Sequence, residues 1–197
     1  MIRDRIKATF PWHLANCLTT RNTIYVADYT EQTKRRKKKK GVILFDGIPP
    51  EDIHCFILKN PNLVELDGIA FNNKSFVKAD GNVDSQCECV IYPHTSDKHS
   101  WICFVELKYS YKPKNNTTNL SKACAQLFHT QAHYRSHGVF GTGNPCYLLA
   151  ALPEQYPPFA NFSLSPSYLL QLKRRYNITL RISNSAKIVN ERVIIGI

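Results

Sequence analysis

The sequence predicts a mixed α/β domain in which helices flank a central mixed sheet. Two observations support this class. Apolar segments of strand length are interrupted by segments with the period of a helix, and the central order of three strands, a helix and a strand is typical of a mixed sheet. Hydrophobic residues make up 43% of the 197 residues, and no Gly/Ser-rich or Pro-rich linker divides them. We therefore expect a single domain over residues 1–197.

The first half of the chain is predicted to contain mainly strands. Residues 23–27 and 42–45 are short apolar runs that would form an N-terminal hairpin. Residues 49–57 begin with Pro-Pro-Glu-Asp, which is typical of a short helix entered through proline. The Asn-Asn pair at 72–73 separates residues 69–71 from residues 75–77 and predicts a tight hairpin.

The second half shows stronger periodicity. Residues 87–92 and 101–109 are the clearest strands, and a polar segment joins them. A helix is predicted over residues 119–137, where Leu120, Ala123, Cys124, Leu127 and Tyr134 form an apolar stripe and Gly138 follows. The uniformly apolar residues 146–152 predict a strand that is buried on both faces. A helix beginning at Ser165-Pro166 and strands at 178–182 and 187–195 would complete the chain.

The charge of the chain is concentrated in one segment. Lys and Arg number 26 against 15 Asp and Glu, a net charge of +11. Seven of the basic residues are consecutive. The rest of the chain has 19 basic and 15 acidic residues, so without this run its net charge is only +4. Mutual repulsion predicts a solvated loop between the strands of the N-terminal hairpin. It could be a plain loop, a nuclear address, or an arm that binds nucleic-acid phosphates. The run is Lys34, Arg35, Arg36, Lys37, Lys38, Lys39 and Lys40.

Other features bear on location and metal content. No apolar run approaches the ~20 residues of a membrane span, and the start of the chain does not resemble a secretory signal. We expect no membrane partner and a cytoplasmic protein, or a nuclear one in a eukaryote. The odd number of cysteines, seven, argues against a disulfide scaffold. A zinc site at Cys87 and Cys89 is disfavoured by their spacing, so the cysteines are expected in the core.

Three charged residues suggest a chemical site. Glu106 and Lys108 alternate with apolar residues, so both project from the same face of their predicted strand. Antiparallel pairing with the preceding strand could bring Glu88 beside Glu106. Two adjacent carboxylates and a lysine favour Mg²⁺ (or Mn²⁺), because hard cations take oxygen ligands. Such an ion can polarise a phosphoryl group, while the lysine orients water or stabilises developing charge.

The sequence Glu88, eighteen residues, Glu106-Leu107-Lys108, followed by a helix and an apolar strand, resembles the PD-(D/E)XK nuclease superfamily. The similarity covers about residues 50–152 and implies a restriction-endonuclease-like αβββαβ core, here with an N-terminal strand hairpin and a C-terminal helix-strand extension. It implies that Glu88, Glu106 and the carbonyl of Leu107 bind the metal and that Lys108 lies beside the water. Gln126 or Lys122 would face the site from the next helix.

Two positions depart from the family pattern. The first acid is usually an Asp preceded by Pro, whereas this chain has Cys87-Glu88. Asp80 and Asp84 lie close upstream and are alternative first acids. Many members also carry a Glu on the first core helix, for which Glu51 and Glu65 are candidates.

The combined features predict a Mg²⁺-dependent endonuclease that hydrolyses phosphodiester bonds, with DNA favoured over RNA. By family analogy it would act in restriction, repair or anti-phage defence, and cutting both strands would suit a homodimer. The alternatives are an inactive nuclease-fold module that binds nucleic acid or a protein partner, and a structural protein in which Glu106 and Lys108 form an ordinary ion pair. Expected phosphate contacts beyond the basic run are Lys122, His129, His133, Lys173, Arg174 and Arg175.

Overall fold

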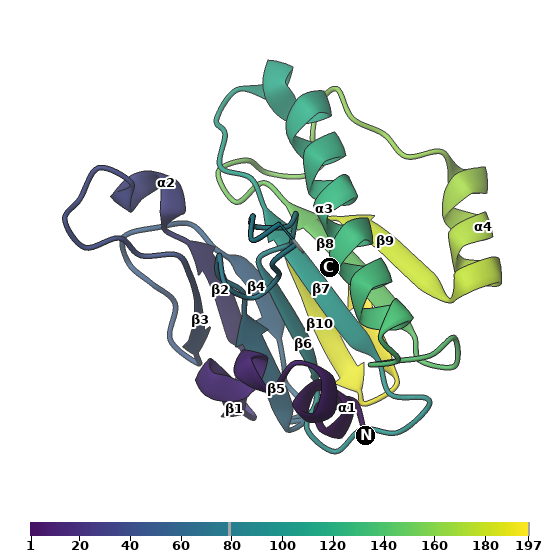
Figure 1. The fold of residues 1–197 in the computed structure, drawn as a ribbon. Helices are drawn as coiled ribbons and strands as arrows, with labels where there is room; N and C mark the ends of the chain where they lie inside the picture. The colour runs from purple at the N-terminus through teal and green to yellow at the C-terminus, as the bar shows by residue number, and fades with distance from the viewer. Residues whose placement is uncertain (79, 197) are drawn as a thin grey trace.

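Two mixed β-sheets and a layer of helices form the protein (Figure 1). The computed structural model describes residues 1–78 and 80–196. The six-stranded sheet has the order β1 (Cys17–Thr20), β5 (Leu66–Ala70), β6 (Cys89–Pro93), β7 (Ile102–Leu107), β8 (Cys146–Ala151) and β9 (Ile178–Ile182). The five-stranded sheet has the order β11 (Val193–Gly196), β10 (Ser185–Asn190), β4 (Phe56–Lys59), β2 (Ile24–Asp28) and β3 (Val42–Asp46).

The helices lie on one face of the six-stranded sheet. α1 (Ile2–Thr9), α3 (Asn116–Ser136) and α4 (Pro166–Tyr176) share one hydrophobic core with that face. The contacts between elements place α3 on β7 and β8 and α4 on β9. Three short helical segments lie in connections: η1 (Pro11–Asn16), α2 (Thr30–Thr33) and η2 (Pro113–Asn115).

The five-stranded sheet covers the other face of the six-stranded sheet. Inward side chains of both sheets form a second core, to which β2 contributes Ile24 and Val26 and β6 contributes Ile91. The sheets approach closely at Gly68 of β5, where an added Cβ would lie 2.7 Å from Leu44 Cδ1. Strands β6, β7 and β8 are therefore buried on both faces, in keeping with their largely apolar sequences, in which Glu106 of β7 is the charged exception.

The central topology determines where the charged residues meet. Strands β5, β6 and β7 form an antiparallel meander. The chain then passes through α3 and returns as β8, which is parallel to β7, and β9 is parallel to β8. The crossover lays α3 along β7, which carries Glu106, and β8 (Figure 1), and Thr130 of α3 accepts the N–H of Cys87, the residue before Glu88.

The predicted mixed α/β class is confirmed, and most predicted strands are present. β2 and β3 pair antiparallel, as the N-terminal hairpin requires, with the basic run in their connection. The prediction of a single central sheet was wrong, because a second sheet is formed by β2, β3, β4, β10 and β11. The predicted last strand is in fact a hairpin of β10 and β11.

Two local predictions were wrong. Residues 49–57, all of which the structure describes, contain no helix. Phe56 and Leu58 alternate with less buried neighbours, and they belong to β4 of the five-stranded sheet, with their side chains in the core between the two sheets. The Asn72-Asn73 segment turns, because Ser75 N donates to Asn72 O at 2.9 Å, but residues 75–77 do not return onto β5. The partners of β5 are instead β1 and β6.

None of the helices in the described part of the chain combines the length and the apolar character that crossing a membrane requires.

Candidate active site

Glu88 and Glu106 lie side by side at the end of the meander. Cys89 of β6 is opposite Val105 of β7, so the residue before β6 faces Glu106. The Glu88 N–H donates to the Val105 carbonyl at 3.0 Å, which extends the pairing to this position. The predicted antiparallel pairing of these two strands is therefore confirmed.

Glu106 is fully buried, with 0% of its surface exposed. Lys108 Nζ lies 2.5 Å from Glu106 Oε1 as an ion pair. The contact lacks the direction of a hydrogen bond, and among the described residues neither carboxylate oxygen of Glu106 has a hydrogen-bond partner. Burial raises the pKa of Glu106 to about 7, and Lys108 only partly opposes this rise. Lys108 supplies one positive charge for the two neighbouring carboxylates, so ionisation of both Glu106 and Glu88 would leave one negative charge uncompensated, which is costly.

The environment of Glu88 also opposes ionisation. Burial raises its pKa well above the usual value, and the neighbouring charges of Glu106 and Asp28 raise it further. Two carboxylates that share a site do not ionise independently, because each charge disfavours the other. A cation between them would remove this repulsion. The geometry is therefore that of a site for positive charge.

Gln126 on α3 connects Lys108 to the sheet. Lys108 Nζ donates to Gln126 Oε1 at 2.7 Å, and Gln126 Nε2 donates to the carbonyl of Gln86 at 2.7 Å. Gln126 therefore fixes the ammonium group beside Glu106 and ties α3 to the segment that leads to Glu88. The structure brings together four predicted site residues: Glu88, Glu106, Lys108 and Gln126.

The Leu107 carbonyl faces the same side of β7 as Glu88. Lys108 N donates to Ala151 O on β8, whereas the Val105 carbonyl accepts from Glu88 on the β6 side. Backbone direction alternates along a strand, so Leu107 shares the orientation of Val105. The N–H of Cys87, opposite Leu107, donates to Thr130 Oγ1 instead of to β7. An oxygen ligand at Leu107 is therefore compatible with the backbone.

Glu88 opens on a cavity of about 590 Å³ that is lined by four lysines. Three belong to the basic run and the fourth to the turn after β5. The lysines are Lys34, Lys39, Lys40 and Lys74, and Gln86, Phe71 and Asn72 are among the other lining residues. Lysines of the basic run and Glu88 thus line one cavity, although about 50 residues separate them in sequence.

Hydrogen bonds hold together the two ends of the basic run, at Thr33 and Lys40. Thr33 is 2% exposed; its Oγ1 accepts the Lys40 N–H at 2.8 Å and donates to the Tyr29 carbonyl at 2.8 Å. Lys40 Nζ also lies 5.0 Å from the centre of the Tyr29 ring. The side chains of residues 34–40 are exposed, as repulsion predicts. The run is therefore a solvated loop that is closed at its base.

Other predicted contacts lie outside this cavity. Arg35, Arg36, Lys37, Lys38 and Lys122 are exposed but do not line it. His129 Nε2 pairs with Asp84 Oδ2 at 2.9 Å, and His133 packs against aromatic rings. Lys173, Arg174 and Arg175 are on α4, which covers β9, two strands beyond β7.

The alternative acids have other partners. Asp80 accepts hydrogen bonds from Asn82, Asp84 pairs with His129, and Glu65 pairs with Arg21 at 3.5 Å. Glu51 is exposed in a bend before β4. None of the four lines the cavity that Glu88 faces.

Asp28 is a residue that the sequence did not single out. It ends β2 in the second sheet, and its charge raises the pKa of both Glu88 and Glu106. Its Oδ1 accepts hydrogen bonds from Thr30 N at 2.8 Å and Thr30 Oγ1 at 2.5 Å. No local sequence pattern identifies Asp28 as a site residue, because Asp28 comes near Glu88 and Glu106 only when the two sheets pack on each other.

The cysteines lie elsewhere in the core or at its margin. Cys87, Cys89 and Cys103 are buried, and burial raises the pKa of each thiol well above its usual value. Within residues 1–78 and 80–196, no three or more His, Cys, Asp or Glu side chains form a metal-binding group. Glu88 and Glu106 supply two carboxylates.

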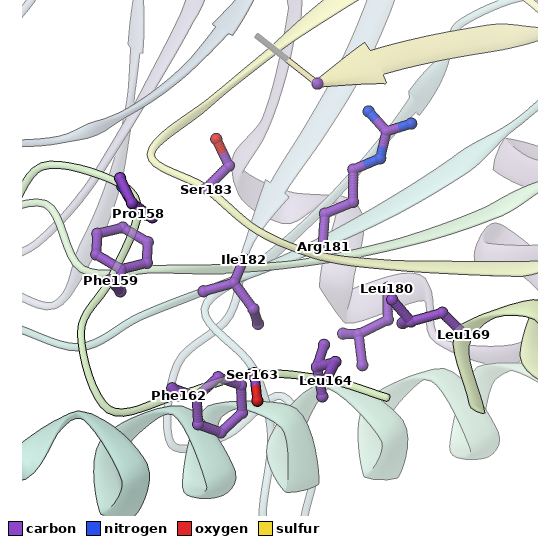
Figure 2. Close-up of a pocket in the computed structure, with 11 residues that line it drawn as sticks. Pro158, Phe159, Phe162, Ser163, Leu164, Leu169, Leu180, Arg181, Ile182 and Ser183 are labelled. Carbon is purple, nitrogen blue, oxygen red and sulfur yellow. The ribbon is translucent and has the colours of Figure 1, made fainter. Parts of the chain in front are cut away.

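A further cavity, of about 540 Å³, lies along β9 (Figure 2). Phe162, Leu164 and Ile182 contribute to its apolar wall, and among residues 1–78 and 80–196 no carboxylate, histidine or cysteine side chain lines it. In Figure 2 the Arg181 guanidinium points away from these apolar side chains. This cavity lacks the acid, base and metal-ligating groups that the Glu88 cavity combines.

Comparison of the chain with protein-family models, curated proteins and solved structures gave no match.

Proposed function

We propose that the protein is a metal-dependent nuclease that hydrolyses phosphodiester bonds, with DNA favoured over RNA as substrate. One observation carries the proposal. The buried Glu106 carboxylate lies beside the half-buried Glu88, and Glu88 lines a cavity that four lysines also line. A site that needs positive charge thus lies beside groups that attract phosphates.

The arrangement of the elements supports the resemblance to the PD-(D/E)XK superfamily. A meander of β5, β6 and β7 is followed by α3 and by β8 parallel to β7. The helix expected at residues 49–57 does not form, and we assign its place to α1, which lies on the same face as α3. The second sheet would then be largely an insertion between α1 and the meander.

The residues fit a hard divalent cation such as Mg²⁺. The carboxylates of Glu106 and Glu88 and the Leu107 carbonyl are oxygen donors of the type that Mg²⁺ takes. Few protein ligands suffice, since Mg²⁺ keeps several waters and uses substrate phosphates. When bound, the ion would polarise the scissile phosphate and acidify water.

The other residues would bind and orient the substrate. Lys108, held by Gln126, places its ammonium where charge develops on the attacked phosphate. Lys34, Lys39 and Lys40 bind flanking phosphates without reading sequence. Asp28 adds negative charge that favours the cation.

Cleavage of supercoiled plasmid and end-labelled oligonucleotides with Mg²⁺ or Mn²⁺ tests the proposal. Glu106→Gln and Lys108→Ala should each lower the rate by about 10²–10³-fold, the range for removal of one charge-stabilising group. Glu51→Gln is the matched control, because this exposed carboxylate lies outside the cavity. Wild-type cleavage by both site variants would refute the assignment.

A catalytically inactive module that binds nucleic acid is the second candidate. The four lysines of the cavity favour it, since phosphate binding does not require the acids. Salt-dependent binding without cleavage at any tested Mg²⁺ or Mn²⁺ concentration would select it. Loss of binding on replacing Lys39 and Lys40 would place the contact in the cavity. A role in defence or repair, and action as a homodimer, are further proposals by family analogy.

A further inference from the structure

α3 carries three histidines at intervals of one helical turn, at positions 129, 133 and 137. Residues four apart on a helix lie on the same face, so their side chains are neighbours. The first of the three is already bonded to Asp84 through Nε2. The other two are close together, with ring centroids 4.4 Å apart and planes inclined by 34°.

Phe10, which follows α1, holds both rings in place. Its ring centroid lies 5.5 Å from that of His133 and 5.3 Å from that of His137. Phe76 lies 5.1 Å from the His133 ring at 89°. The two imidazoles are therefore supported by packing, and His137 is exposed on its outer side.

Hydrogen bonding leaves lone pairs on these rings. His137 Nδ1 lies 2.8 Å from the His133 carbonyl oxygen. A carbonyl only accepts, so Nδ1 carries the proton and Nε2 keeps its lone pair. Histidine ligands of metals commonly make this second bond to a backbone carbonyl.

The His133 ring has no hydrogen-bond partner within the described part of the chain. Burial, with the nearby His137, lowers its pKa and favours the neutral form that binds metals.

We propose that His133 and His137 form a second metal site, which takes an imidazole-binding ion of the Zn²⁺, Ni²⁺ or Cu²⁺ type. Two histidines at i and i+4 on one helical face are a recognised chelating spacing, and imidazole nitrogens suit these ions better than Mg²⁺. The described residues supply no third His, Cys, Asp or Glu, so water or an exogenous ligand completes the coordination. The site does not depend on the proposed nuclease activity.

Titration calorimetry with Ni²⁺, on the chain without a histidine tag, tests this site. The wild type should bind one Ni²⁺, and His133→Asn or His137→Asn should weaken binding by at least about tenfold, the lower end of the effect of even outer-shell changes at metal sites. His99→Asn, at an exposed histidine, is the matched control. His137 is exposed, so its variant carries the test if His133→Asn fails to fold.

Three outcomes would overturn the proposal. They are absence of Ni²⁺ binding, unchanged affinity in His137→Asn, and loss of affinity in His129→Asn while His137→Asn is unaffected. The double variant Glu88→Gln/Glu106→Gln should bind Ni²⁺ as the wild type does. If instead it alone loses Ni²⁺, the ion occupies the carboxylate site. Failure of either site is therefore distinguishable from failure of the other.

Discussion

Asp67 of β5 and Glu106 of β7 are both 0% exposed in the six-stranded sheet, but their surroundings differ. Asp67 accepts hydrogen bonds from Arg3 Nη1 at 2.7 Å, Thr19 Oγ1 at 2.7 Å and His94 Nδ1 at 3.0 Å. Glu106 has one ion-pair contact, with Lys108, and no hydrogen bond to its oxygens from the described residues.

The ionisation of the two acids differs accordingly. Burial disfavours the charge of Asp67, but hydrogen bonds from His94, Arg3 and Thr19 outweigh it and lower the pKa. Burial dominates at Glu106 and raises the pKa to about 7. A buried acid with all its partners holds the fold together, whereas one without them is poised for a cation or a reaction. The comparison predicts a structural role for Asp67 and is consistent with the functional role that we propose for Glu106.

The largest expected effect is on the stability of Asp67→Ala. Removing this buried carboxylate takes the acceptor away from Arg3, Thr19 and His94, and a hydrogen bond to a charged group contributes about 1.5–3 kcal/mol, so the free energy of unfolding should fall by about 3–5 kcal/mol. Urea denaturation followed by circular dichroism measures it. Glu65→Ala removes a neighbouring, half-exposed ion pair with Arg21 and should change stability by at most about 1 kcal/mol. Equal losses in both variants would contradict the structural role of Asp67.

Mg²⁺ should stabilise the protein through Glu106 and not through Asp67. At a free concentration 100 times the dissociation constant, a ligand of the native state adds about 2.7 kcal/mol. Thermal unfolding with increasing Mg²⁺ should show this gain in the wild type and lose it in Glu106→Gln. Thr19→Val leaves the Glu106 site intact and should keep the gain. Undiminished Mg²⁺ stabilisation of Glu106→Gln would place the cation elsewhere.

The two acids should give opposite pH dependence. Between the usual Glu pKa of about 4.5 and the folded value of about 7, native Glu106 holds a proton that the unfolded chain has released. Stability from this group should therefore fall as pH rises through that range, by up to about 1.4 kcal/mol per pH unit. Glu106→Gln should reduce this slope in unfolding measured without divalent cations, while burial of Glu88 keeps the remainder; an unchanged slope would contradict the assignment.

The lowered pKa of Asp67 acts in the other direction. Its stabilisation is complete above the unfolded pKa of an Asp and is lost as pH falls through the folded value. Acid unfolding of the wild type should therefore be steeper than that of Asp67→Ala. Identical acid limbs in the two proteins would show that Asp67 does not contribute.

The smallest effect belongs to one donor of Asp67. Thr19→Val removes one of its three hydrogen-bond donors and should lower the free energy of unfolding by about 1 kcal/mol. Thr118→Val on the exposed face of α3 is the matched control and should have less effect. If Thr19→Val left the free energy of unfolding unchanged, hydrogen bonds from Arg3 and His94 would be enough to stabilise the buried Asp67 carboxylate.

Much of the centre of the fold could be predicted from periodicity. Strands β6, β7 and β8 and helix α3 follow local apolar patterns, which depend on near neighbours in the chain. The same alternation predicted that Glu106 and Lys108 share a face, and the ion pair confirms it. The helix predicted over residues 49–57 was wrong. The prolines of this segment suggest a helix start, but Phe56 and Leu58 follow the two-residue period of a buried strand, which spans Phe56–Lys59.

The sequence by itself determined the charged residues, their spacing and the strands that present them, because these depend on local alternation. Only the tertiary structure decided that Asp28 and the basic loop reach the same site as Glu88, and that Asp67 rather than Glu106 receives the donors. Those outcomes depend on contacts between segments 27 to 64 residues apart. Such contacts form when two sheets pack on each other and a helix packs along one of them, and no local pattern encodes them.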